Sequence, residues 1–188
     1  MKINTTTLAG TATLAALVVV FDYTMKYSGL KIIFPLLPFL KFDFTGIPIV
    51  LSLLLFGLIP GTFTSIIASV AILARSGQVV SSSMKGVAEF STILGMAVGL
   101  KLFRRFRMVG SFAIGLTSRV MIMIFVDLAL IYAGVISLPT SYTDIPAVAA
   151  LLVGAFNAVQ GTLSILGGYS IYEAVKRRVP SLVKSKER

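Results

Sequence analysis

The chain contains no cysteine, no histidine and no tryptophan, and only 13% of its 188 residues are charged. Without cysteine it forms no disulfides, and without cysteine or histidine it lacks the thiolate and imidazole groups of common metal sites and nucleophilic catalysts. Soluble domains carry about 25% charged residues, so the low charge also argues against a soluble domain. The chain is instead 56% hydrophobic, with a mean hydropathy of +0.95. These features indicate an integral membrane protein with several spans.

Hydropathy predicts six helices, because several apolar stretches approach the roughly 20 residues that cross a bilayer. The stretch from residue 44 to 74 is too long for one span, and Gly57, Pro60 and Gly61 interrupt it near its middle. It is therefore predicted as two short helices joined by a tight turn. The predicted fold is an all-α integral membrane protein with one transmembrane domain over residues 1–188. Its spans are predicted at about residues 6–24, 46–58, 61–74, 84–103, 109–136 and 145–175.

The net charge of +10 is concentrated in two basic clusters that adjoin apolar helices. One cluster contains Lys101, Arg104, Arg105 and Arg107, and the other lies within residues 176–188. Two predicted spans separate the clusters, so both lie on one side of the membrane, which is the cytoplasmic side by the positive-inside rule. With six spans both termini are cytoplasmic, and the expected location is the cell membrane, as a multi-pass protein. The clusters are expected to contact anionic lipid head groups rather than nucleic acid.

Four polar side chains from three different spans are expected in the outer half of the membrane: Glu89, Asp127, Asn157 and Gln160. Charged residues inside a span cost about 2.5–3.5 kcal/mol on insertion scales, so each requires a reason. A polar cluster beneath a charged outer loop favours a pocket for a polar solute. The alternative is hydrogen bonding between helices for assembly. Arg119 lies deeper and is predicted to be a structural partner for a carboxylate or a helix end.

The first outer loop is rich in proline and leads directly into the apolar stretch that begins at residue 44. It carries Phe39, Leu40, Lys41 and Asp43. Its prolines restrict the backbone, which lowers the entropic cost of closing over a ligand. We therefore predict a lid over a buried pocket, and the alternative is a rigid cap held by a Lys41–Asp43 pair. Lysines at positions 26, 31 and 41 oppose the positive-inside rule, which indicates charges held there by structure or by function.

The first predicted helix is rich in small residues. Ala12 and Ala16 form a small-xxx-small step that lets another helix approach closely. Close packing within the same protein is the default interpretation, and a docking face for a second membrane protein is the sharper alternative.

Three motifs resemble those of the substrate-binding S components of energy-coupling factor (ECF) vitamin transporters, most closely the riboflavin-specific S component. The loop PFLKFDFTGIP at residues 38–48 is similar to that family's P-F-L-K-[YF]-D-[FP]-S-D-I-P loop. The sequence FGLIPG at residues 56–61 resembles its F-G-P-x-x-G turn, and FNAVQG at residues 156–161 resembles its F-N-x-x-K-G step. The Ala12/Ala16 face resembles the A-x-x-x-A docking motif of such proteins.

The resemblance implies a six-helix bundle with a long first outer loop that captures a vitamin from outside. The bundle would deliver the vitamin by associating with a transmembrane coupling subunit and two cytoplasmic ATPase subunits. The chain has no G-x-x-x-x-G-K-[ST] phosphate loop, which agrees with ATP hydrolysis in those partners. Riboflavin or a related flavin is the implied ligand, transported rather than held as a cofactor, and another small heteroaromatic vitamin is the alternative. No cofactor and no metal are expected.

The polar cluster, the outer loop and the resemblance together give a set of predicted functional residues. The predicted ligand-binding residues are Phe39, Leu40, Lys41, Asp43, Glu89, Asp127, Asn157 and Gln160, and the predicted docking residues are Ala12 and Ala16. The chain departs from the family pattern at Gln160, where Lys is usual, at Asp127, in a region where Asn is usual, and at Gly46, where Asp is usual. The first two changes lower the positive charge of the pocket, which is expected to disfavour an anionic or electron-rich ligand group.

Two other functional classes remain as alternatives. The chain is not expected to be an intramembrane enzyme, because it has no D-D-x-x-D metal cluster and no G-x-S-x-G elbow, and nothing places Glu89 and Asp127 at a substrate bond. A self-contained secondary transporter is the second alternative, but the inverted repeats and matched broken helices of many transporters are not detectable in the sequence.

Overall fold

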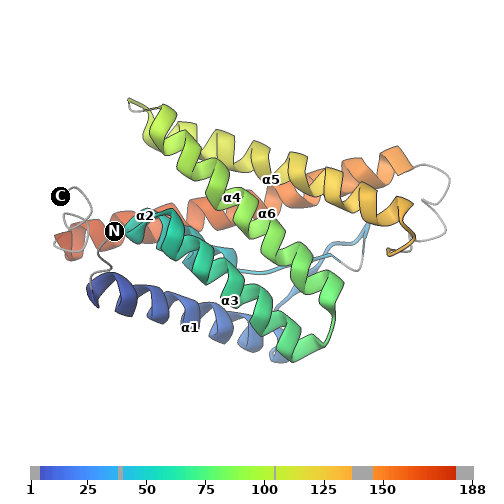
Figure 1. The fold of residues 1–188 in the computed structure, drawn as a ribbon, viewed down its shortest axis with the longest axis horizontal. Coiled ribbons are helices and arrows are strands. Elements are labelled where there is room, and N and C mark those ends of the chain that lie inside the picture. Colours follow the sequence, from blue (N-terminus) through green and yellow to red (C-terminus); the bar gives the residue numbers. More distant parts are fainter. Residues whose placement is uncertain (1–4, 38–39, 104, 137–145, 181–188) are drawn as a thin grey trace.

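The structure of the protein is a computed structural model, and it describes residues 5–37, 40–103, 105–136 and 146–180. These residues form a bundle of helices and one short antiparallel ribbon (Figure 1). In chain order the elements are α1 (Thr5–Tyr27), β1 (Ile32–Ile33), β2 (Lys41–Phe42), α2 (Gly46–Phe56), α3 (Leu58–Ser76), α4 (Val79–Leu102), α5 (Arg107–Tyr132) and α6 (Pro146–Arg178).

The helices lie in two sets of opposite direction, so that the connections gather at the two ends of the bundle (Figure 1). One end holds the start of α1, the α2–α3 junction, the α4–α5 connection and the end of α6. The other end holds the ribbon β1–β2, in which Ile32 pairs with Phe42 and Ile33 with Lys41. The basic residues Lys101, Arg105 and Arg107 therefore lie at the same end as the basic end of α6, as the sequence predicts.

Within the described residues, four helices are long and apolar enough to cross a membrane: α1, α3, α5 and α6 from Val148. α4 is also long, with 24 residues. α2 has only 11 residues, which at about 1.5 Å per residue covers roughly half of a hydrocarbon core about 30 Å thick. The six predicted helices are thus present in the predicted order, while the crossing of the membrane by all six stays a prediction.

α2 is the buried centre of the bundle. All of its residues except Ile47 and Phe56 are buried, and a helix that is apolar all round requires a buried position. Residues of α1, α3, α4 and α6 complete the core around it, among them Val18, Ala68, Ile93 and Ile165. The side chains of α2 therefore contact neighbouring helices rather than lipid.

The break between α2 and α3 is narrower than predicted. Only Gly57 separates the two helices, and its φ of 104° is a conformation that side chains rarely adopt. Pro60 and Gly61 lie in the first turn of α3, where proline is tolerated because the amide group has no partner within the helix. The predicted helix boundaries at residues 58 and 61 are therefore wrong, and the helices meet at Phe56 and Leu58.

Glycines let α4 and α5 approach very closely. A β-carbon added at Gly99 would lie 2.5 Å from the carbonyl oxygen of Gly110, and one added at Gly95 would lie 2.7 Å from that of Ile114. Such approaches bring backbone against backbone, which is a common way for helices to associate in membranes. The α4–α5 hairpin forms one wall of the site described below.

We expect Gly99→Ala to destabilise the protein by about 1–3 kcal/mol, the usual cost of overpacking, because the added methyl group meets rigid backbone. Thermal unfolding of the protein in detergent measures the effect. Val98→Ile, which enlarges an exposed side chain of the same helix, is the matched control and is expected to unfold at the wild-type temperature. Equal midpoints for Gly99→Ala and the control would contradict the close approach of α4 and α5.

Candidate ligand-binding cavity

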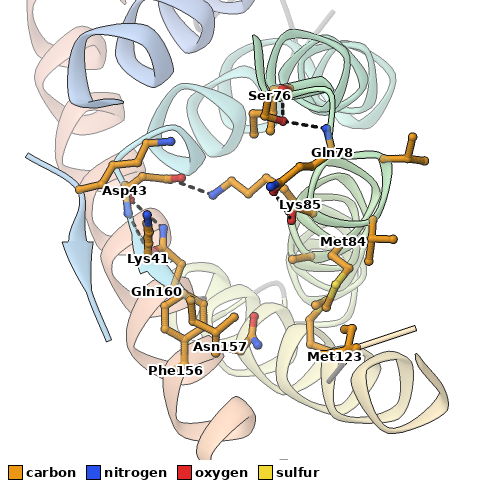
Figure 2. Close-up of a pocket in the computed structure, with 18 of the residues that line it drawn as sticks. Lys41, Asp43, Ser76, Gln78, Met84, Lys85, Met123, Phe156, Asn157 and Gln160 are labelled. Atoms are coloured by element: carbon orange, nitrogen blue, oxygen red, sulfur yellow. Dashed lines mark hydrogen bonds and ion pairs between the residues drawn. The ribbon is translucent and has the colours of Figure 1, made fainter. Parts of the chain in front are cut away.

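A cavity of about 940 Å³ lies at the end of the bundle that carries the ribbon. Ligand pockets usually measure about 300–1,000 Å³. Its lining comes from the end of α1, the first loop, the end of α3, the α3–α4 connection, α4, α5 and α6. Figure 2 shows Phe156, Asn157 and Gln160 of α6 on one side, and Met84 of α4 and Met123 of α5 on the other. Separate helices therefore supply the opposing walls.

The aromatic part of the cavity is built from α6 and the loop. Phe156 packs against Phe42 of β2, with ring centroids 4.7 Å apart, and against Phe34, at 5.8 Å. Phe156 itself lines the cavity. Phe156 belongs to the motif at residues 156–161, but no role was predicted for it. Its position directly before Asn157 could have indicated that it lies at the cavity.

Gln160 holds the loop rather than pointing a free amide into the cavity. The backbone N–H of Asp43 donates to Gln160 Oε1 over 3.2 Å, and Gln160 Nε2 donates to the carbonyl oxygen of Asp43 over 2.7 Å. Both groups are buried. This two-point contact attaches the loop to α6 at a position 117 residues further along the chain.

The carboxylate of Asp43 is held from the opposite wall by Lys85. The Lys85 ammonium donates to Asp43 Oδ1 over 2.8 Å (Figure 2), and Thr45 donates to the same oxygen from its backbone and its hydroxyl. Burial alone would raise the pKa of Asp43, but the Lys85 charge and these hydrogen bonds outweigh it and hold the pKa below the ordinary value of 3.8. The alternative interpretation, a cap held by a Lys41–Asp43 pair, is therefore wrong, because Asp43 pairs with Lys85.

Lys85 lines the cavity and was not among the residues predicted from the sequence. Its ammonium also lies 2.9 Å from Glu89 Oε1. The two residues are four apart on α4, which is the spacing at which charged side chains of a helix meet, so the pair could have been found. Glu89 itself is fully buried behind Lys85 and does not line the cavity.

Arg119 joins three helices beneath the cavity. Its Nη1 donates to Glu89 Oε1 and to Thr92 Oγ1, each over 3.1 Å, and its Nε donates to Asn157 Oδ1 over 3.2 Å. The prediction that Arg119 is a structural partner for a carboxylate is confirmed. It also lines the cavity, which the sequence analysis did not predict.

Asp127 is not brought to the cavity. It is buried on α5, one turn beyond Met123, and it is not part of the lining. Its Oδ2 accepts no hydrogen bond from the residues that the structure describes. The geometry thus gathers Asp43, Asn157 and Gln160 at the cavity and leaves Asp127 apart from them. Of the loop residues, Leu40 and Lys41 line the cavity, and Phe39 lies outside the described residues.

Gly46 is explained by the closeness of α2 to α6. A β-carbon added at this position would collide with Ser164 Oγ and lie 2.8 Å from Glu89 Oε2. An aspartate at this position would require these side chains to move and would place a second carboxylate beside Glu89, so Gly46 suits the packing of this chain.

A second cluster of charges anchors the loop on the side of α1. Asp22 is fully buried and pairs with Lys31 of the loop and with Arg75 of α3, whose Nε lies 2.6 Å from Asp22 Oδ2. The outer lysine at position 31 is thus held by structure. The pairing of Asp22 with Arg75 was not predicted from the sequence. Asp22 is an acidic residue near the end of an apolar helix, and such a residue indicates a basic partner.

The face of α1 with Ala12 and Ala16 is exposed, whereas Leu14, Ala15 and Val18 of the same helix are buried. Packing of these two alanines within the protein, the default interpretation, is therefore wrong. Their role in docking a second membrane protein stays a prediction. No three potential acidic metal ligands lie together among the described residues.

Comparison with solved structures gives the fold. The chain is similar to a structure described as the S component of a bacterial ECF transporter, with a TM-score of 0.73 and 16% sequence identity over 95% of this chain and 97% of that one. This chain has the S-component fold. Neither the scan of protein-family models nor the search of curated proteins finds a match.

We expect Lys85→Met to lower the free energy of unfolding of the protein by roughly 3 kcal/mol, because Asp43 loses its cationic partner. This is the usual cost of leaving a buried charge unpaired. Thermal unfolding in detergent measures this loss. The double variant Asp43→Asn/Lys85→Met is expected to recover much of it, and Lys101→Met, at an exposed lysine of α4, serves as control. A Lys85→Met protein as stable as the control would show that the ion pair does not hold the loop.

Proposed function

We propose that this chain is the substrate-capture subunit of an ECF vitamin transporter and that it binds riboflavin or a related flavin. The observation that carries the proposal is the cavity of about 940 Å³ beneath a loop attached to two opposing helices, in a chain with the S-component fold. The similarity of residues 38–48 to the loop of riboflavin-specific S components supports a flavin as ligand.

The walls of the cavity suit a planar, partly apolar ligand. Phe156 faces Met84 and Met123 across the cavity (Figure 2), and both aromatic rings and methionine sulfur make favourable contacts with flat aromatic groups. A flavin ring would lie between them.

The amides of α6 would orient the polar edge of the ring. Asn157 uses one N–H in its hydrogen bond to the carbonyl oxygen of Val153 and its Oδ1 in accepting from Arg119, which leaves one N–H donor. Gln160 Oε1 accepts from Asp43 N, which leaves one acceptor position. A donor beside an acceptor matches the carbonyl and N–H edge of a heterocycle such as a flavin.

Delivery of the ligand would use the exposed alanine face of α1. Ala12 and Ala16 lie on this face without a helix of the described bundle against them, and small residues permit close approach of a partner helix. The partner would be the transmembrane coupling subunit, and two cytoplasmic ATPase subunits would supply the energy.

The ligand proposal is tested by titrating purified protein with riboflavin and following the quenching of flavin fluorescence. We expect Asn157→Ala to weaken binding by about tenfold, the effect of losing one or two hydrogen bonds. Val159→Ala, at a half-exposed position of the same helix, is expected to bind as the wild type does. Unchanged affinity in Asn157→Ala would remove this residue from the site, and a wild-type protein that binds no flavin would refute the flavin assignment.

The proposal that α1 docks to the coupling subunit is tested with a second variant. Ala12→Leu/Ala16→Leu is expected to keep riboflavin binding and to lose ATP-driven uptake in liposomes that contain the coupling and ATPase subunits. Val70→Leu, an exposed position on α3, is the control and is expected to retain uptake. Uptake by the lone chain without an ATPase would instead favour the self-contained transporter.

A further inference from the structure

The lining of the cavity is strongly basic. Six cationic side chains contribute to it, whereas Asp43 is its single acidic residue among the described residues. The cations are Lys26, Lys31, Lys41, Arg75, Lys85 and Arg119. Five of them belong to the half of the bundle that the positive-inside rule places outside, where lysine and arginine are disfavoured, and Arg119 lies deeper, near the middle of α5.

Three buried carboxylates form ion pairs with four of these cations. Asp22 pairs with Lys31 and Arg75, Asp43 with Lys85, and Glu89 with Lys85 and Arg119. Lys26 and Lys41 have no carboxylate partner in the described parts of the chain. The six cations and these three carboxylates leave three positive charges in excess, and one remains even if the buried Asp127 of α5 and, from the sequence, Asp144 are both counted in full.

Positive charge that lines a concave site attracts and concentrates anions. Both Lys26 and Lys41 are exposed and line the cavity, so both add positive charge to its lining. The hydroxyls of Ser76 and Ser81 and the amide of Gln78 lie in the same lining and add hydrogen-bonding groups.

We propose that the natural ligand carries a phosphate monoester, bound by Lys26 and Lys41, while its planar part lies against Phe156. Two ammonium groups without partners match the charge of a phosphate monoester, about −1.5 to −2 at pH 7, better than that of a neutral alcohol. This proposal rests on the proposed function and adds a phosphate group to the description of the ligand. The expectation that Gln160 and Asp127 disfavour an anionic group concerns their own part of the pocket and stays a prediction, whereas the proposed phosphate site lies at Lys26 and Lys41.

The test compares riboflavin with riboflavin 5′-phosphate, which differ only in the phosphate group. For the wild type we expect the phosphate form to bind about tenfold more tightly, as for charged hydrogen bonds. The ratio is expected to fall toward one in Lys26→Gln/Lys41→Gln and to persist in Lys101→Gln/Arg105→Gln, which removes two positive charges at the other end of the bundle. Riboflavin binding as tightly as its phosphate, or more tightly, would overturn the phosphate proposal and leave the proposed function intact.

If neither flavin binds, the flavin assignment fails, and inorganic phosphate then tests the site by itself. At equal ionic strength, phosphate is expected to raise the thermal midpoint relative to chloride in the wild type and in Lys101→Gln/Arg105→Gln, but not in Lys26→Gln/Lys41→Gln. Equal midpoints in phosphate and chloride for the wild type would overturn the proposal.

Discussion

The loop above the cavity depends on Asp43, which two different helices hold in two different ways. Its backbone exchanges two hydrogen bonds with the Gln160 amide of α6, and its carboxylate accepts the ammonium of Lys85 from α4. These helices face each other across the cavity (Figure 2). One residue of the loop therefore fixes both the position of the loop and the separation of the walls beneath it.

The charges below Asp43 alternate in sign, which explains how the bundle tolerates them. Asp43, Lys85, Glu89 and Arg119 follow one another, and each charge has an opposite one within 3.1 Å. An isolated charge inside a membrane is costly, and a buried charge that loses its partner is strongly destabilising. The chain of pairs instead carries no net charge and extends from the loop to the deepest polar side chain of the site. The lysines without a carboxylate partner in the described residues, Lys26 and Lys41, are exposed at the rim, and the Asp22 cluster with Lys31 and Arg75 holds one further positive charge.

The hydropathy pattern was sufficient to predict the helices, because long apolar stretches have few other solutions in a membrane. It was not sufficient for their exact ends, since one glycine with a positive φ, Gly57, replaces the longer turn expected between residues 57 and 61. The amides of α6 and the acid of the loop were also predicted from the sequence, because polar residues in apolar surroundings need a reason. Which charges pair was not predictable, since Lys85 and Asp43 are 42 residues apart and meet only through the fold. Asp127 was predicted to join the site because of its depth in the membrane, but it does not line the cavity. Equal depth does not bring side chains of different helices together.

The central position of α2 has a consequence for biogenesis. A helix of 11 residues is too short to remain in a bilayer alone, so it must enter together with α3 as a hairpin bent at Gly57. Much of its cover, and the residues Phe156, Asn157 and Gln160, come from α6, about a hundred residues later in synthesis. A nascent chain that has reached only α5 therefore possesses the outer loop but no amide to hold it. The cavity is therefore complete only when the sixth helix has joined the bundle.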